Sequence, residues 1–432
     1  MNTHRTDDVF GVSRGVPLNY TSRADVDTVF IESLSKQRHI VLHGSSKQGK
    51  TALRKECLAS ADYITVQCLS SWDLDALHAA ILKEAGFDLT EGTSKTTNGK
   101  LKAAATVKAG ISVPFLGSAG GQVSMGGGKN DSITVKKAPL ELDLADVNDV
   151  IRALTSINFK GFIALEDFHY LPEETQKKFA VALKAFHERS PYCFIVIGVW
   201  LEHDRLSVYN GDLAGRVTSI SVDRWSSADL HRVIEKGEQL LNIELDATFK
   251  EELVQNALES VYIVQDVCNR ACIDCGIYET QRERTVVRPK ESARDLIKSI
   301  VDKEAARYGT FLQRFADGFR DTQLQMYRWL LLPIIDAPIE QLEQGLRYRD
   351  IRECLQENHP EGRGLNLGNL TLSLQSVASL QVKHGIKPLI LDYDQTSNRL
   401  TVVDRSFMVW LEHQDREELK EALEIVVGKQ QD

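Results

Sequence analysis

The sequence predicts an α/β protein built on a parallel sheet, followed by a helical domain and a second small domain. Three observations predict this. Short apolar runs rich in β-branched residues alternate with segments of helical period, which is typical of strands joined by crossover helices. Residues 39–53, HIVLHGSSKQGKTAL, place a strand, a glycine-containing loop and a helix start in succession. From residue 321 the order changes to three helices and then a hairpin.

Length and composition narrow the class of protein. A chain of 432 residues is too long for one ordinary core, and 42% apolar and 26% charged residues are typical of a globular protein. The net charge of −9 argues against coating of nucleic acid by the whole protein but leaves room for a local basic patch. No apolar run is long enough to span a membrane, and the first residues, MNTHRTDDVF, lack an apolar signal core. We therefore expect a cytoplasmic protein.

Residues 44–51 form the phosphate-loop motif G-x-x-x-x-G-K-[ST]. In such a loop, consecutive N–H groups and the following helix N-terminus face an anion. Lys50 would reach the β- and γ-phosphates, and the Thr51 hydroxyl would ligate Mg²⁺. The predicted binding residues of the loop are Gly44, Ser45, Ser46, Lys47, Gln48, Gly49, Lys50 and Thr51.

A second acidic element follows downstream. The apolar strand predicted at 161–165 ends in Glu166 and Asp167. In a nucleotide site, one such carboxylate holds Mg²⁺, and its neighbour orients or activates the attacking water. We expect Glu166 and Asp167 to share these two roles, together with Thr51 as a metal ligand, and the division between them stays open.

Three further residues are candidates with alternatives. Tyr20 and Arg23 precede the loop closely enough to lie over a base, or they belong to a surface lead-in. Arg216 lies just before the predicted edge strand VTSISV. It would stabilise transition-state charge in a neighbouring subunit or in its own site, or it is a salt-bridged surface arginine.

Residues 92–137 differ in composition from the rest, with nine glycines and seven lysines against one acid, Asp131. We interpret them as a glycine-rich two-stranded insertion. Such a hairpin grips a polyanion, lines the pore of a ring, or is a solvated insertion.

The C-terminal part predicts a winged helix. Its helices are expected at 323–332, 348–357 and 367–383, and its hairpin pairs PLILDYD with RLTVVDRSF. The third helix often reads DNA in such modules, but its outer face here has no Lys or Arg before Lys383. DNA binding and protein contact therefore both stay open. The expected core stripe of this helix is Leu367, Leu370, Leu374 and Val377.

The cysteine spacing C-x3-C-x2-C at Cys268, Cys272 and Cys275 lies on one helix face, which indicates core packing rather than a metal cluster. We expect a charged linker at 284–291 and a single helix at 292–319. The predicted domains are an α/β core at 1–222 with the insertion at 92–137, a helical lid at 223–285, a linker helix at 286–320, the winged helix at 321–416 and a tail at 417–432.

With these residues placed, 17–275 resembles the P-loop ATPase modules of the AAA+ and STAND groups. The matching pieces are GSSKQGKT, IALEDFHYL, GDLAGRV and RWSSADL. The stretch IALEDFHYL is similar to the STAND pattern, with Glu166 where Asp is usual. Arg216 is similar in position to the AAA+ arginine finger, and Tyr262 occupies roughly the place of a second sensor arginine.

The resemblance implies a slow, Mg²⁺-dependent ATPase that acts as a conformational switch, assembles into a homo-oligomer and works with a partner effector or sensor protein. A bacterial, anti-phage defence context is one expectation. Two alternatives remain: a nucleic-acid-handling AAA+ initiator or loader that uses the insertion or the winged helix, and a nucleotide-binding scaffold with little turnover.

Overall fold

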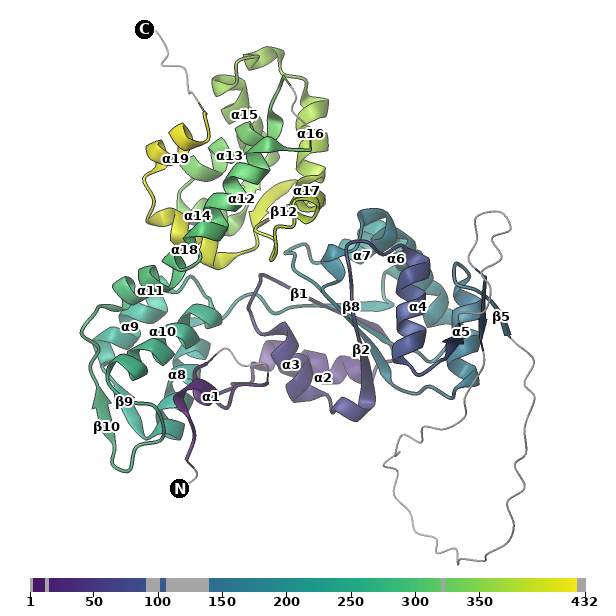
Figure 1. Cartoon of the computed structure of the whole chain (residues 1–432), viewed down its shortest axis with the longest axis horizontal. Helices are drawn as coiled ribbons and strands as arrows, with labels where there is room; N and C mark the ends of the chain where they lie inside the picture. Colours follow the sequence, from purple (N-terminus) through teal and green to yellow (C-terminus); the bar gives the residue numbers. More distant parts are fainter. Residues whose placement is uncertain (1–2, 12–14, 91–101, 106–139, 320–322, 426–432) are drawn as a thin grey trace, which may run out of the picture.

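The computed structural model describes residues 3–11, 15–90, 102–105, 140–319 and 323–425. Figure 1 shows three bodies along this part of the chain. The first is a sheet with flanking helices, which we call the core. The second is a helical body beside the N-terminus, which we call the lid. The third, the C-terminal body, carries the last described residues.

Five strands form one parallel sheet in the core. Their order is β2 (Tyr63–Gln67), β6 (Phe162–Glu166), β7 (Phe194–Ile197), β1 (His39–His43) and β8 (Val217–Ser221). The inner strand β1 is buried along its whole length, as expected for a parallel strand covered on both faces. The parallel α/β core predicted from the sequence is therefore confirmed, and the carboxyl ends of its strands share one edge.

Helices cover both faces of this sheet. Val41 packs with α4 (Leu74–Glu84), α5 (Val147–Ser156) and α6 (Glu173–Arg189). Ile40 and Leu42 point to the other face, where α2 (Val29–Leu34) and α3 (Lys50–Cys57) lie. The remaining short elements of the core are η1 (Ala24–Thr28), η2 (Ser60–Asp62), η3 (Phe168–Tyr170), α7 (Arg205–Tyr209) and η4 (Gly211–Leu213).

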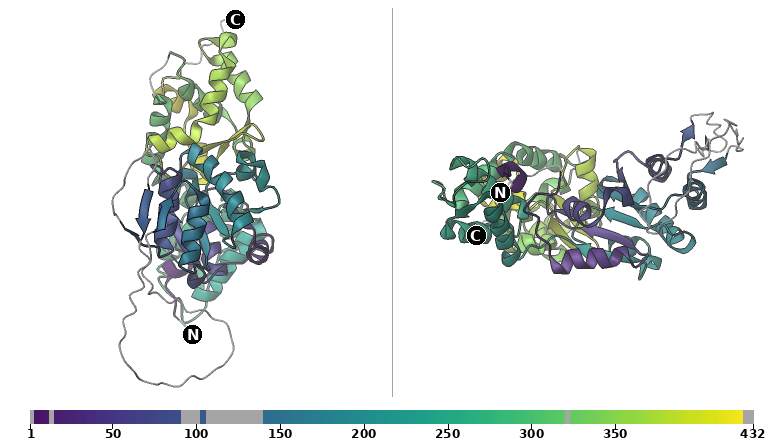
Figure 2. Two further views of the ribbon diagram at one scale, coloured as in Figure 1. Left: turned by 90° about the vertical axis from the view of Figure 1, so that its right-hand side faces the viewer. Right: turned by 90° about the horizontal axis from the view of Figure 1, so that it is seen from below.

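A small antiparallel sheet is attached to the core. It has the order β3 (Leu89–Thr90), β4 (Lys102–Ala105) and β5 (Leu140–Asp143). In Figures 1 and 2, β4 and β5 stand on the side of the core away from the lid. Apart from 102–105, the predicted insertion at 92–137 lies outside the described residues.

The lid contains α8 (Ser227–Leu241), α9 (Ala247–Asn256), α10 (Val261–Asp274) and α11 (Ala293–Asp302). Helix α8 begins with a capping box formed by Ser226 and Asp229. The N-terminal α1 (Thr6–Val9) packs against α8 and α10, and Phe10 is buried there.

The linker expected at 284–291 is part of the lid rather than a free connection. Within it, β10 (Thr285–Val287) pairs in parallel with β9 (Ile243–Leu245). The single helix expected at 292–319 is also wrong, because the chain forms α11 and then α12 (Ala305–Asp317). The charged residues and one proline at 284–291 indicated a boundary between domains. The pairing of β10 with β9 instead makes this segment part of the lid.

The C-terminal body follows the predicted order with additions. It comprises α12, α13 (Met326–Asp336), α14 (Ile339–Gln344), β11 (Leu346–Arg347), α15 (Tyr348–Asn358), η5 (Gly362–Gly364), α16 (Leu367–Gln375), α17 (Val377–Lys383), β12 (Leu391–Asp394), β13 (Arg399–Val402), α18 (Arg405–Glu412) and α19 (Arg416–Ala422). Its antiparallel sheet has the order β11, β13, β12. This arrangement is consistent with a winged-helix domain.

Three details of the C-terminal prediction differ from the structure. The predicted hairpin strand RLTVVDRSF ends early, because β13 stops at Val402 and residues 405–407 begin α18. The third helix is divided at Ser376 into α16 and α17. Of its predicted core stripe, Leu370, Leu374 and Val377 are buried, whereas Leu367 is 37% exposed.

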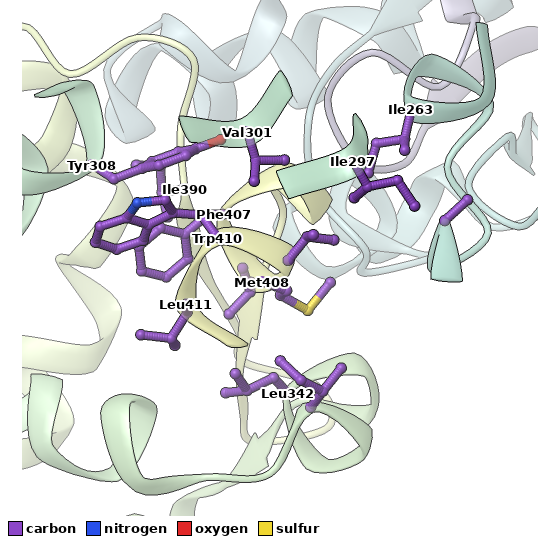
Figure 3. Close-up of a cluster of buried hydrophobic side chains, with 14 of the residues drawn as sticks. Ile263, Ile297, Val301, Tyr308, Leu342, Ile390, Phe407, Met408, Trp410 and Leu411 are labelled. Carbon is purple, nitrogen blue, oxygen red and sulfur yellow. The ribbon is translucent and has the colours of Figure 1, made fainter. Parts of the chain in front are cut away.

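The helix α18 joins the lid to the C-terminal body. Figure 3 shows Phe407, Met408, Trp410 and Leu411 of this helix among apolar side chains of both bodies. The contacts include Ile297 and Val301 of α11. The two bodies therefore share one continuous apolar core. No helix in the described ranges combines the length and apolar character that a membrane span requires.

Candidate phosphate-binding site

The predicted phosphate loop connects β1 to α3 at the carboxyl edge of the sheet. Gly44 and Gly49 have φ values of 141° and 88°, which side chains other than glycine rarely adopt. A Cβ atom on Gly44 would also lie 3.1 Å from the backbone nitrogen of Asp223. The loop can therefore adopt this curled backbone only because glycine stands at both positions.

Lys50 lies fully inside this curl. Its amine donates hydrogen bonds to the carbonyls of Gly44 (2.9 Å) and Ser45 (2.6 Å). Burial lowers the pKa of Lys50 to about 8, although the acids at 223, 167 and 166 oppose the shift. An anion in the loop would stabilise the charged amine that burial destabilises.

Of the two predicted acids, Glu166 is the last residue of β6 and faces the start of α3, and Asp167 follows it directly. The Oε2 atom of Glu166 lies 3.4 Å from the Thr51 hydroxyl, while its Oε1 atom is bound by Arg54. Asp167 accepts a 2.5 Å hydrogen bond from the Gln67 amide. Burial, reinforced by the charge of Glu166, raises the pKa of Asp167. Thr51 and both carboxylates thus lie together at the mouth of the loop.

These groups line a cavity of about 340 Å³ between the core and the lid. The size suits a small organic ligand. Its walls include Ser46 to Ala52 of the loop, both acids, Tyr20, and Trp225 and Tyr262 from the lid side. Gln48 also lines it, and both polar atoms of its buried amide have no hydrogen-bond partner in the described structure. An unpaired buried amide is costly unless a ligand satisfies it, so the cavity fits a polar ligand.

The two candidates before the loop have different surroundings. Tyr20 lines the cavity, and its hydroxyl donates a 2.6 Å hydrogen bond to Asp27. Arg23 is not among the cavity-lining residues in the described structure. Its guanidinium lies 3.9 Å from the Trp225 ring centroid and donates to the carbonyls of Val222 and Arg224. Arg23 therefore supports the cavity wall from behind.

Arg216 lies at the amino-terminal ends of the strands, whereas the loop lies at their carboxyl ends. Its neighbour Val217 pairs with His39, the first residue of β1, whereas the loop follows His43. Its guanidinium binds Glu188 at 2.9 Å. Within one chain Arg216 is thus separated from the loop by the length of β1, and a role toward a neighbouring subunit stays a prediction.

The structure adds functional candidates that the sequence analysis missed. Trp225 and the reciprocal amide pair of Asn19 and Gln265 (2.8 and 2.9 Å) line the cavity. Arg54 binds Glu166, and Asp223 accepts a 2.6 Å hydrogen bond from the Ser45 amide. Arg54 could have been suspected from its position one turn after Thr51. The pairs Asn19–Gln265 and Ser45–Asp223 have no such signal, because their members lie far apart in the chain.

The C-terminal body touches the tip of the loop. The Ser46 amide donates to the carbonyl of Val403 at 2.9 Å. The Lys47 amine binds Glu304 at 2.6 Å and lies 4.0 Å from the Tyr262 ring centroid.

Two further ion pairs support this contact. Asp223, which holds the Ser45 amide, also binds Arg405 at 2.8 Å. Arg307 lies in the first turn of α12, directly after Glu304, and binds Asp404 at 2.6 Å. We call the bonds of Ser45, Ser46 and Lys47 to Asp223, Val403 and Glu304 the loop-tip contacts.

The cysteine spacing belongs to the apolar core. Cys268 and Cys272 are fully buried in α10, and burial raises the pKa of both thiols, that of Cys272 to about 12. Among the described residues, no group of three or more His, Cys, Asp or Glu side chains is placed to hold a metal ion.

Comparisons with known proteins extend the description of the fold. Protein families and curated proteins give no match. Among solved structures, the chain is similar to a Walker-type ATPase of Pyrococcus abyssi, with a TM-score of 0.54 and 13% identity over 94% of this chain and 99% of that one. Similarity to the Aeropyrum pernix ORC2 protein has a TM-score of 0.45 and 11% identity, over 96% of each chain. The first of these likenesses agrees with the parallel sheet and the loop between β1 and α3. This chain has the fold of the P-loop ATPases.

Proposed function

We propose that the protein is an ATP-binding and slowly ATP-hydrolysing conformational switch that oligomerises and acts on a partner protein. The observation that carries the proposal is the shared cavity of the phosphate loop and the paired acids, whose wall the lid completes and whose loop the C-terminal body contacts. The P-loop ATPase fold supports nucleotide binding at this cavity.

The chain's residues fit a nucleoside triphosphate with Mg²⁺. The amides of 47–51 and the Lys50 amine would hold the phosphates. Thr51 and Glu166 would hold Mg²⁺, because their oxygens already face each other. When bound, Mg²⁺ would neutralise phosphate charge during hydrolysis. Tyr20 lies on the cavity wall, where it can contact the base.

The two acids can now be given separate roles. Glu166 is fixed by Arg54 and faces Thr51, so it suits the metal. Asp167 has a raised pKa and is held by Gln67, so it suits orientation of the attacking water. Only one acid would orient the attacking water, and Tyr262 stands roughly where the resemblance would place a second sensor arginine. Both features are consistent with slow ATP turnover.

The loop-tip contacts are the basis for proposing a switch. They place the end of β13 and the start of α12 on the same loop that would receive phosphates. A ligand that changes the position of this loop would also change the energy of these contacts. The lid and the C-terminal body share one core, so both would respond together. The homo-oligomer, the partner and the bacterial defence context stay predictions.

The proposal is tested by titration with a fluorescent ATP analogue and by mass measurement in solution with and without a non-hydrolysable analogue. We expect the wild type to bind and to change its mass, and Lys50→Ala to lose both properties. Lys36→Ala, which removes a surface lysine paired with Glu32, is the matched control. A wild type without affinity for any nucleoside triphosphate, or normal assembly of Lys50→Ala, would overturn the proposal. A repeat with DNA distinguishes a nucleic-acid-handling role.

A further inference from the structure

Arg54 makes an unusual contact beside the candidate site. It lies one turn after Thr51 on α3 and is 2% exposed. Its Nε and Nη2 atoms both donate to the same oxygen of Glu166, Oε1, at 3.1 and 2.8 Å. Its guanidinium carbon also lies 4.4 Å from the ring centroid of Tyr63 on β2. The aromatic ring and the acid together fix the guanidinium.

This contact divides the two oxygens of the carboxylate. Oε1 is engaged by Arg54, whereas Oε2 faces the Thr51 hydroxyl at 3.4 Å. Glutamate is one methylene longer than aspartate and has one more torsion to fix, which costs conformational entropy. Two hydrogen bonds from Arg54 to Oε1 restrict that torsion before any ligand binds.

We propose that Arg54 is a positioning residue that holds Glu166 with a single oxygen, Oε2, toward Thr51, where a divalent cation would be bound with the nucleotide. The inference rests on the proposed function and deepens it. It explains how a glutamate can serve at the end of β6. Arg54 touches neither phosphate nor metal in this role and acts only through Glu166.

The competing explanation is a purely structural ion pair, in which Arg54 only neutralises a buried acid. Removal of Arg54 would then affect folding stability without a specific change in the metal requirement. The two explanations therefore differ in the metal concentration that the site needs.

The test is the Mg²⁺ dependence of fluorescent ATP-analogue binding, without any measurement of turnover. Each variant is titrated first in EDTA and then at increasing Mg²⁺, so that its own metal-free affinity is the reference. For Arg54→Gln we expect the Mg²⁺ midpoint to rise about 10–100-fold, the usual effect of losing a residue that orients a metal ligand. Arg54→Lys, which retains one donor and the charge, should lie between Arg54→Gln and the wild type.

Two further variants sharpen the test. In Arg54→Gln combined with Glu166→Asp, the shorter acid needs no tether, so the midpoint should return toward the wild-type value. Arg349→Gln removes an arginine from an exposed 2.8 Å pair with Glu353 and should leave the midpoint unchanged.

A midpoint in folded Arg54→Gln that is unchanged, or lower than in the wild type, would overturn the positioning role. If Arg54→Gln does not fold, Arg54→Lys decides, and a wild-type midpoint for that variant would overturn it equally. A wild type that binds no nucleotide at any Mg²⁺ concentration would instead refute the proposed function itself.

Discussion

The loop-tip contacts predict that Glu304→Gln will release the phosphate loop from the C-terminal body. Lys47 and Glu304 lie 2.6 Å apart, and their side chains are only 30% and 21% exposed. Burial opposes both charges, but their mutual hydrogen bond raises the pKa of Lys47 and lowers that of Glu304. Glutamine keeps the shape of the side chain and removes its charge.

The free energy lost in Glu304→Gln follows from the short distance and partial burial of the Lys47–Glu304 pair. A charge-assisted hydrogen bond contributes about 1.5–3 kcal/mol when protected, and exposed pairs contribute less than about 1 kcal/mol. For a partly buried pair we expect a loss of about 1–2 kcal/mol. The fraction of molecules with an open loop tip would then rise about 5–30-fold.

Hydrogen exchange of the loop peptide measures this fraction. The Ser46 amide donates to the Val403 carbonyl and exchanges only when that contact opens. We expect its exchange to accelerate about 5–30-fold in Glu304→Gln, as the preceding estimate gives. Asp212→Asn breaks another 2.6 Å pair, with Lys184 on the outer surface, and is the matched control.

Unchanged protection of Ser46 in Glu304→Gln would refute the reasoning, since the ion pair would then not hold the loop. The same acceleration in Asp212→Asn would also refute it, because the effect would reflect general loss of stability.

Three further predictions concern pH and assembly. The folded pKa of Lys50 is about 8, so deprotonation above that pH removes the charge that attracts phosphate. Binding of an ATP analogue by the wild type should be about tenfold weaker at pH 9 than at pH 7, and an affinity that does not change over this range would contradict a role for the Lys50 charge. Burial lowers the pKa of His39 to about 4, so between pH 6.5 and 4 the unfolded chain binds the proton first. The free energy of unfolding, measured in urea, should therefore fall by up to about 1.4 kcal/mol per pH unit on acidification through this range, and less in His39→Gln. Arg216→Ala should lower ATP turnover only at protein concentrations that support assembly, and an equal loss at all concentrations would contradict a role between subunits.

The core and the phosphate loop were predictable because their signals are local. The apolar runs of β1, β6 and β7 predict strands, and the eight-residue motif predicts the phosphate loop. Each pattern consists of adjacent residues and needs no distant partner. The acids at the end of β6 followed from the same logic, since parallel strands bring their carboxyl ends to one edge.

The helix α18 could not be predicted in this way. Residues 407–411 are apolar enough to continue a strand, and a short apolar run does not separate helix from strand. They form a helix because two bodies bury all of its sides. The surroundings of Arg23 were equally hidden, because its partners Val222 and Arg224 lie about two hundred residues later.

Several residues that precede the phosphate loop line the cavity, among them Pro17 and Tyr20. The segment at Thr6 to Phe10 is anchored in the lid, whereas Phe30 on α2 is buried against the central sheet. Between these anchors, Tyr20 lies on the cavity wall. Residues 19–30 thus connect the two bodies, because Asn19 pairs with Gln265 of the lid and Phe30 is buried in the core, and a movement of one body relative to the other would pull on them. Ligand entry would then be transmitted to residues 19–30, far along the chain from the lid helices that they contact.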